Sequence, residues 1–247
     1  MFKILFKIYF WIIEVPLFAI LTILTALTAA FGCMVGSKRI FSYYPGSIWA
    51  RLACILTLCP VKITGRENII KGKPYIIASN HQSVFDIFTI YGYIGVPLLF
   101  MMKKSLGKIP LVGFACKKCG FVFVDKSSVR TAFQSIKEAE TKLLSGNKSL
   151  IVFPEGSRTR DGKMNKFKRG AFQIAVDSKI AVLPVTLNGP YYIMKGNSWD
   201  IFPHRIEMII HHPVMPPENI IDDKEKMQYL ANETHSAIYQ SLEKKFQ

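Results

Sequence analysis

The sequence has 247 residues, half of them hydrophobic, and a formal net charge of +15 from 32 basic and 17 acidic side chains. A chain of this length and apolar content can bury enough surface to offset the entropy lost on folding, which excludes global disorder. The surplus of positive charge predicts an anionic partner, and composition alone does not decide among nucleic acid, acidic lipid and a phosphorylated substrate.

The first element in chain order is an apolar segment at residues 8–36, whose only charged side chain is Glu14. The uncharged part, residues 15–36, is long enough to cross a bilayer core of ~30 Å. A cleaved signal peptide is disfavoured, because the apolar part exceeds the usual length of such signals and no clear small-residue cleavage site precedes Cys33. The segment therefore predicts a membrane protein.

Both flanks of this segment are basic, with Lys3 and Lys7 before it and Lys38, Arg39 and Arg51 after it. Positive flanks favour the cytoplasmic side, so both ends are expected there. A single crossing of the bilayer satisfies only one flank.

A second apolar stretch, "IWARLACILTLC" at residues 48–59, follows "YYPGS", whose Pro-Gly pair indicates a turn. Two helices that enter one leaflet as a hairpin would satisfy both basic flanks. We expect residues 1–60 to form this two-helix membrane anchor, and a true transmembrane span is the alternative.

After Pro60, short apolar runs alternate with amphipathic stretches. This alternation predicts an α/β domain over residues 61–247, a layered domain with a mostly parallel central sheet flanked by helices. The expected strands are residues 73–79, 120–125, 149–155, 180–187 and 205–212, and the expected helices are residues 83–94, 127–147, 168–179 and 223–245.

Polar side chains follow three of the expected strands. His81 comes after "YIIAS", Asp125 and Lys126 after "FVFV", and Glu155 after "LIVFP". Open α/β sheets bind ligands at the carboxyl ends of their strands, so we expect these residues to converge on one site.

The stretch "NHQSVFD" at residues 80–86 has two interpretations. His81 and Asp86 would lie about 140° apart on one straight helix, so they can pair only if His81 precedes a helix that begins near Ser83. In that case Asp86 would orient the imidazole and leave its other nitrogen to accept a proton from a hydroxyl. Alternatively, Ser83 and Asp86 form a capping box and His81 is an ordinary loop residue.

The stretch "FPEGSRTR" at residues 153–160 combines a Pro-Glu-Gly turn with Arg158 and Arg160, whose planar guanidinium groups suit phosphate. Residues 103–169 hold sixteen basic and five acidic side chains, so much of the surplus charge lies there. A solvated basic surface explains part of this excess, and a phosphate-bearing substrate near an anionic membrane also explains its position. The sequence has no Gly-x-Ser-x-Gly elbow and no Walker loop, which favours direct transfer by a histidine–carboxylate pair without a covalent intermediate.

The five cysteines are thinly spread and odd in number, which does not indicate a disulfide framework. Cys116 and Cys119 have the spacing of a redox or zinc motif, but no second cysteine pair or histidine pair accompanies them. We interpret them as ordinary thiols and expect no metal site.

Four stretches together resemble the glycerolipid acyltransferases, most closely the bacterial 1-acylglycerol-3-phosphate O-acyltransferases. "NHQSVFD" resembles the Asn-His-x-x-x-x-Asp motif of that family, and "FPEGSRTR" resembles its Phe-Pro-Glu-Gly-Ser/Thr-Arg block. The stretch "KKSLGKIPLVGFACKKCGFVFVDK" at residues 103–126 resembles the second block, and "AVLPV" resembles the fourth. Order and spacing agree across residues 1–215.

The resemblance implies a role for each matching residue. His81 would be the general base on the sn-2 hydroxyl of 1-acylglycerol 3-phosphate (lysophosphatidic acid), and Asp86 would orient it. Arg158 and Lys104 would bind the phosphate, while Glu155, Gly156 and Ser157 would shape the same pocket. Lys126 replaces the arginine that commonly ends the second block, so it keeps the charge but loses the bidentate geometry.

The same resemblance implies that an acyl-CoA or acyl-carrier-protein thioester is the acyl donor, that phosphatidic acid is the product and that no further cofactor is needed. The membrane bilayer would be a partner, with the catalytic domain on the cytoplasmic face of the cytoplasmic membrane. Glycerol 3-phosphate or another lysophospholipid is the alternative acceptor. A non-enzymatic protein that binds anionic lipid is the alternative of a different class, and nucleic-acid binding is disfavoured because no recognised motif is present.

Overall fold

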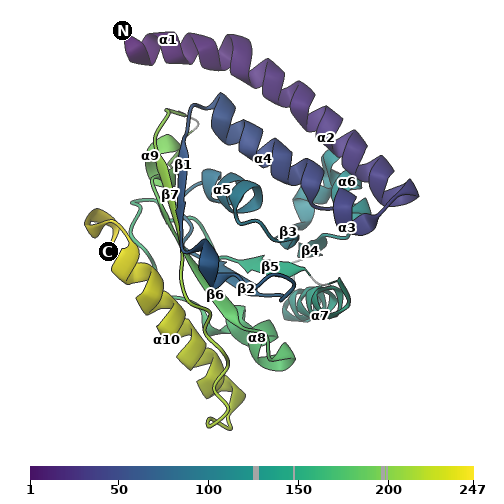
Figure 1. Ribbon diagram of the computed structural model, residues 1–247, viewed down its shortest axis with the longest axis vertical. Coiled ribbons are helices and arrows are strands. Elements are labelled where there is room, and N and C mark those ends of the chain that lie inside the picture. The colour runs from purple at the N-terminus through teal and green to yellow at the C-terminus, as the bar shows by residue number, and fades with distance from the viewer. Residues whose placement is uncertain (125–127, 147, 196–197, 199) are drawn as a thin grey trace.

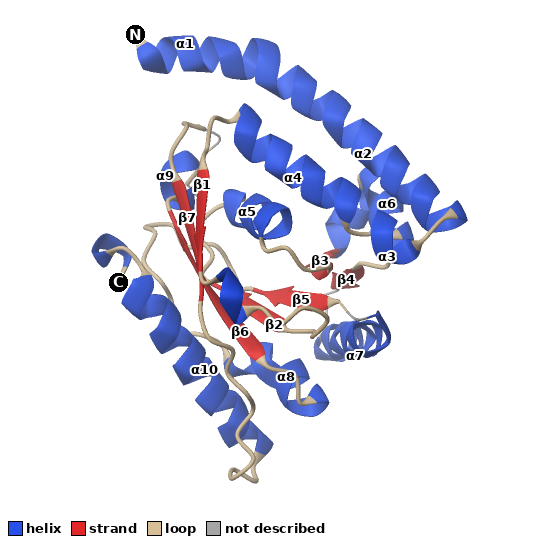
Figure 2. Cartoon of the chain, viewed as in Figure 1, coloured by secondary structure: helices blue, strands red, loops and turns tan. Residues whose placement is uncertain are grey.

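The computed structural model of the chain describes residues 1–124, 128–146, 148–195, 198 and 200–247. Its centre is a seven-stranded sheet with helices on both faces (Figures 1 and 2). The strands lie in the order β1-β7-β6-β2-β5-β3-β4. Their bounds are β1 Val61–Thr64, β2 Ile76–Ser79, β3 Leu98–Lys103, β4 Val122–Val124, β5 Ser149–Val152, β6 Val182–Asn188 and β7 Ile206–Ile210.

Neighbouring strands pair in parallel except for β6 and β7, which are antiparallel. The structure therefore confirms the predicted α/β fold with a mostly parallel sheet. Strands β2 and β6 are buried along their whole length, as expected for central strands that are covered on both faces. Because β2, β3, β4, β5 and β6 run in the same direction, the segments that follow them emerge at one edge of the sheet.

The helices form two layers around the sheet. Helices α7, α8 and α10 cover one face, while α5 lies over the other face with α4 and then α2 above it (Figure 1). The helix bounds are α1 Phe2–Tyr9, α2 Val15–Val35, α3 Lys38–Phe41, α4 Tyr44–Leu56, α5 Phe85–Tyr93, α6 Val112–Lys118, α7 Val129–Gly146, α8 Gln173–Ser178, α9 Pro190–Ile193 and α10 Asp223–Ser241.

The N-terminal segment differs in detail from the expectation. It is helical from Phe2 to Val35, with a π-helical turn at Phe10–Glu14 between α1 and α2. The predicted turn at "YYPGS" is wrong, because Tyr44 and Pro45 begin helix α4 and the chain instead reverses through residues 36–43. Proline is well tolerated in the first turn of a helix, where its missing N–H has no intrahelical acceptor to lose.

Helices α2 and α4 pack against each other, and α2 also packs on α6 (Figure 1). Small residues of α2 face these neighbours: Ala26, Ala29, Ala30, Gly32 and Cys33 are buried. The large apolar side chains of α2 point outward instead, and the exposed ones are Leu17, Ile20, Ile23, Leu24, Leu27, Phe31, Met34 and Val35.

Helical residues Phe2–Val35 are long and apolar enough to cross a membrane, and only 28% of their most apolar 18-residue window is buried. A helix with small residues inward and large apolar residues outward is typical of contact with lipid rather than with water. The N-terminal helix therefore suits membrane association. The division at residue 60 stays a prediction, and α4 packs closely on α5 of the following segment.

Two further expectations need correction. The terminal helix was expected over residues 223–245, but α10 ends at Ser241 and a short 3-10 turn follows at Lys244–Phe246. The expected helix at residues 168–179 begins as a 3-10 turn, Arg169–Phe172, before α8.

Candidate active site

The imidazole of His81 lies in the loop between β2 and α5, at the carboxyl edge of the sheet. Its Nδ1 is 2.8 Å from Oδ2 of Asp86, which lies in the first turn of α5. The His81 side chain is 14% exposed and that of Asp86 is fully buried. Because a carboxylate accepts hydrogen bonds, this contact favours the proton on Nδ1 and leaves Nε2 as the basic nitrogen.

Asp86 also holds the loop in place. The same Oδ2 atom accepts the backbone N–H groups of Gln82, at 2.7 Å, and of Ser83, at 2.8 Å. The bond to the Ser83 N–H is the backward half of a capping box. The two interpretations of "NHQSVFD" are therefore compatible, since one carboxylate oxygen closes the helix start and contacts the histidine.

The segment before α5 is tied to the neighbouring strand. The side-chain amide of Asn80 donates to the Leu187 carbonyl and accepts the Leu187 N–H, both at 2.9 Å. It thereby makes the pair of hydrogen bonds that the backbone of a neighbouring strand residue would make. The Ser83 hydroxyl donates to the Met194 carbonyl at 2.7 Å. These bonds fix the backbone on both sides of His81.

The loop after β5 encloses the backbone of His81. Glu155 Oε1 accepts the His81 N–H at 2.7 Å, and its Oε2 accepts the Asn165 N–H at 2.9 Å. The Thr159 N–H donates to the His81 carbonyl at 3.0 Å. The ring of His81 stacks on that of Phe153, with 3.9 Å between centroids and 15° between planes. The "FPEGSRTR" segment therefore supports the histidine along its backbone and on one face of its ring.

Burial raises the pKa of Glu155 above its ordinary value of 4.5, and the N–H donors of Asn165 and His81 oppose that shift only in part. A raised pKa means that the folded protein holds the proton more tightly than the unfolded chain does. The stabilisation that this carboxyl supplies is therefore complete below pH 4.5 and is lost as the pH rises through the raised pKa.

We expect Glu155→Gln to lower the free energy of unfolding by about 1–3 kcal/mol, because the amide nitrogen cannot accept the Asn165 N–H. The glutamine does not titrate, whereas the wild type loses stability with rising pH. The deficit of the variant should therefore shrink between about pH 4 and about pH 8. Thermal unfolding of both proteins across this range measures it, and a deficit that grows with pH would contradict the direction of the pKa shift.

The structure places the remaining predicted residues at or near the same edge. Ser157 and Arg158 are exposed and directly precede Thr159, which is bonded to His81. Lys104 is exposed and directly follows β3. Strand β5 lies between β2 and β3, so the end of β3 is about 10 Å from the end of β2, which precedes His81. Asp125 and Lys126 lie outside the described residues.

The contacts of Phe153 and Asn165 with the His81 loop were not predicted from the sequence. Phe153 begins the quoted "FPEGSRTR" motif at a strand end, which was a usable signal for a residue of the site. Asn165 contributes only its backbone N–H, which leaves no trace in the type of side chain.

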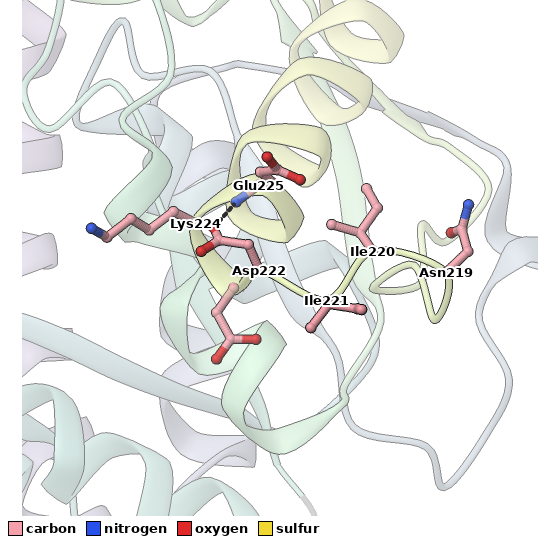
Figure 3. A pocket seen from close by; sticks show the side chains of 7 residues that line it. Asn219, Ile220, Ile221, Asp222, Lys224 and Glu225 are labelled. Atoms are coloured by element: carbon pink, nitrogen blue, oxygen red, sulfur yellow. Dashed lines mark hydrogen bonds between the residues drawn. The ribbon is translucent and has the colours of Figure 1, made fainter.

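One surface hollow lies elsewhere. It has a volume of about 750 Å³ and is lined by Asn219, Ile220, Ile221, Asp222, Asp223, Lys224 and Glu225 (Figure 3). Asp222 caps α10 there by accepting the Glu225 N–H. The chain beyond the other end of α10 contacts the loop after β5, because the Met164 N–H donates to the Phe246 carbonyl. Helix α10 is about 28 Å long, so this contact and the hollow lie far apart. The hollow is therefore separate from the predicted site.

The Cys116–Cys119 pair lies at the end of α6, and Cys119 Sγ is 3.8 Å from Sγ of Cys33. Burial raises the pKa of Cys116 to about 11 and that of Cys119 to about 12. Both groups are therefore protonated thiols near neutral pH.

A mostly parallel sheet with an oriented histidine and cationic loops at its carboxyl edge defines the class of α/β proteins, which usually bind their ligands at that edge. Residues 60–188 match the model of the Acyltransferase family. The chain belongs to this acyltransferase family, which confirms the family resemblance inferred from the four motifs.

Similar proteins carry consistent names. The chloroplastic 1-acyl-sn-glycerol-3-phosphate acyltransferase of Arabidopsis thaliana is 32% identical over 208 residues, which are 83% of this chain and 55% of that protein. A 1-acyl-sn-glycerol-3-phosphate acyltransferase of Pseudomonas aeruginosa is 29% identical over 77% of this chain and 76% of its own. This chain spans about half to two thirds of the length of the plant and algal relatives.

A solved structure agrees over nearly the whole chain. The crystal structure of the 1-acyl-sn-glycerophosphate (LPA) acyltransferase PlsC from Thermotoga maritima has a TM-score of 0.80 and 28% sequence identity. The match covers 97% of this chain and 95% of that one, so the N-terminal helices belong to the shared fold.

Proposed function

We propose that this chain transfers a fatty acyl group from an acyl thioester to the sn-2 hydroxyl of 1-acylglycerol 3-phosphate, giving phosphatidic acid. The observation that carries the proposal is the pairing of His81 Nδ1 with Asp86 Oδ2 at 2.8 Å. The pair lies beside an arginine-bearing loop that suits a phosphate monoester. The printed names of the relatives support the same acceptor.

In the proposed mechanism, Nε2 of His81 removes the proton from the sn-2 hydroxyl as its oxygen attacks the thioester carbonyl carbon. Asp86 stabilises the imidazolium that forms. The C–S bond then breaks, and the imidazolium returns the proton to the departing thiolate. Acyl transfer is direct, and His81 is a base at the start and an acid at the end.

Arg158 and Lys104 are proposed to bind the acceptor phosphate, with Lys126 as a further phosphate ligand. Glu155 is proposed to shape the phosphate pocket indirectly. Both of its oxygens accept backbone N–H groups, so it fixes the shape of the loop and does not bind the anion itself. Gly156 and Ser157 continue the same turn.

We expect Arg158→Met to raise the KM for lysophosphatidic acid by about ten-fold or more while kcat changes little, because a charge-assisted hydrogen bond to phosphate is lost. Arg158→Lys should be intermediate, since lysine lacks the bidentate fork. Lys224→Met is the control, because Lys224 is an exposed cation at the far end of α10. Steady-state kinetics in detergent measure all three, and an unchanged KM in Arg158→Met would contradict the assignment.

The proposed location is the cytoplasmic face of the cytoplasmic membrane. Helices α2 and α4 would dock into the leaflet through their outward apolar side chains, so that lipid substrates enter the site from the bilayer. The basic flanks of the N-terminal helix support a cytoplasmic orientation.

The activity is tested by incubating the purified chain in detergent with lysophosphatidic acid and either acyl-CoA or acyl-carrier protein, following phosphatidic acid and free thiol. Formation of both products in equal amounts is the expected result. Turnover only with glycerol 3-phosphate or another lysophospholipid would change the acceptor. No turnover with any acceptor or donor would favour a protein that binds anionic lipid without catalysis.

A further inference from the structure

Lys168, which belongs to none of the four motifs, lies against the turn that follows β5. Its backbone N–H donates to the Pro154 carbonyl at 3.0 Å. A Cβ atom built on Gly156 would lie 2.7 Å from Nζ of Lys168 and 3.2 Å from its Cε. The ammonium group of Lys168 therefore rests over the α-carbon of Gly156, in the middle of the "FPEGSRTR" segment.

The backbone makes room for this lysine. Gly156 has φ +83°, a conformation that residues with a Cβ rarely adopt, and its N–H closes the turn on the Phe153 carbonyl at 3.0 Å. Lys168 is fixed from the other side as well, because its carbonyl accepts the Ala171 N–H at 3.0 Å. The backbone of Lys168 is therefore fixed at its N–H and at its carbonyl, so its side chain starts from a defined position.

The charges nearby favour an anion rather than an internal partner. Residues 153–169 contain six basic side chains and two acidic ones. Glu155, the acid next to Gly156, already accepts the N–H groups of His81 and Asn165 with its two oxygens. The Lys168 side chain is exposed, so a soluble or lipid-borne anion can reach it.

We propose that Lys168 binds a phosphate group of a substrate, donating from Nζ to a phosphate oxygen beside Gly156. This inference deepens and rests on the proposed acyl transfer. The turn carrying Gly156 lies between Glu155, bonded to the His81 N–H, and Thr159, bonded to the His81 carbonyl. In lysophosphatidic acid the phosphate is attached to the carbon next to the one that bears the reactive hydroxyl, so its site has to lie close to His81. The phosphates of a nucleotide acyl donor offer the same chemistry.

The test compares Lys168→Met with Lys166→Met, which removes another exposed lysine of the same segment. We expect Lys168→Met to raise one KM by about ten-fold or more, and Lys166→Met to leave both within two-fold. A rise for lysophosphatidic acid alone assigns the acceptor phosphate. If only the KM for acyl-CoA rises, and the KM for an acyl-pantetheine donor without the nucleotide does not, Lys168 binds the phosphates of the donor. If both KM values stay within two-fold of wild type, the proposal is overturned.

A binding measurement separates this inference from the proposed activity. The dissociation constants of lysophosphatidic acid and of CoA are measured on His81→Ala and on His81→Ala/Lys168→Met in detergent, with monoacylglycerol as the phosphate-free comparison. A ten-fold weaker affinity for one phosphate ligand, with monoacylglycerol unchanged, supports the site even if the wild type shows no turnover. Equal affinities in the two proteins overturn it. If Lys168→Met lowers the unfolding temperature, Lys168→Gln carries the same measurement, and Lys168→Arg should recover most of the affinity.

Discussion

Replacing His81 with alanine is expected to lower kcat by roughly 10²- to 10⁴-fold, the usual contribution of a positioned general base. The KM for lysophosphatidic acid should change little, since the proposed phosphate ligands stay in place. The stacked contact between His81 and Phe153 is lost, so a decrease of about 1 kcal/mol in the free energy of unfolding is expected as well. Phosphatidic acid formation and thermal unfolding, measured on the same preparation, separate the two effects.

His212→Ala is the matched control, because His212 is an exposed imidazole just beyond the end of β7. It should keep wild-type kcat and wild-type stability. Full activity in His81→Ala would reduce "NHQSVFD" to a helix start and remove the main support for the mechanism. Activity lost in both variants would indicate a general effect of the substitutions on folding.

The position of the site could be predicted from the sequence because it depends on local order. His81 and Glu155 each follow a short apolar run, and parallel strands place such residues at one edge of the sheet. The pairing of His81 with Asp86 also follows from local spacing, given a helix that starts after the histidine. These inferences needed no knowledge of how distant segments pack.

Contacts between distant segments could not be predicted in this way. The bond from Glu155 to the His81 N–H joins residues 74 positions apart, and nothing in the local pattern distinguishes this carboxylate from one that faces a ligand. Lys168 reaches Gly156 only because the loop turns back on itself. A basic residue eight positions beyond the end of a motif looks like any other surface lysine in the sequence.

Two strands were also missed, for different reasons. Strand β1 is only four residues long, and its burial alternates at the edge of the sheet, so it has little apolar signal. Strand β3 begins with "LLFMM", an apolar run without β-branched residues that fits a buried helix as well as a strand. The π-helical turn at Phe10–Glu14 has no reliable sequence signal, because one extra residue per turn barely changes the apolar pattern.

Substitutions of Asp86 can separate the effect of the charge of the proposed catalytic pair from the effect of its geometry. In Asp86→Asn, the Gln82 and Ser83 N–H groups both need an acceptor at the position of Oδ2, so they orient the amide with its oxygen toward them. The same oxygen can still accept the proton of His81 Nδ1, which preserves the tautomer with a basic Nε2. The amide nitrogen then takes the place of Oδ1, a buried atom with no hydrogen-bond partner among the described residues, so the variant loses the negative charge and also buries an NH2 donor without an acceptor. We expect kcat to fall by roughly 10²-fold with a loss of stability of about 1–3 kcal/mol.

Asp86→Ala should behave differently, because it leaves two buried backbone N–H groups without their acceptor. We expect the free energy of unfolding to fall by about 3 kcal/mol and kcat to fall at least as far as in Asp86→Asn. The comparison of kcat with the thermal midpoint in both variants is the decisive measurement. If Asp86→Asn kept wild-type kcat while Asp86→Ala lost stability, Asp86 would serve the helix start alone, and His81 would act without a charged partner. A large loss of kcat in Asp86→Asn, measured at a temperature where the variant stays folded, is the result that requires the carboxylate to take part in the chemistry.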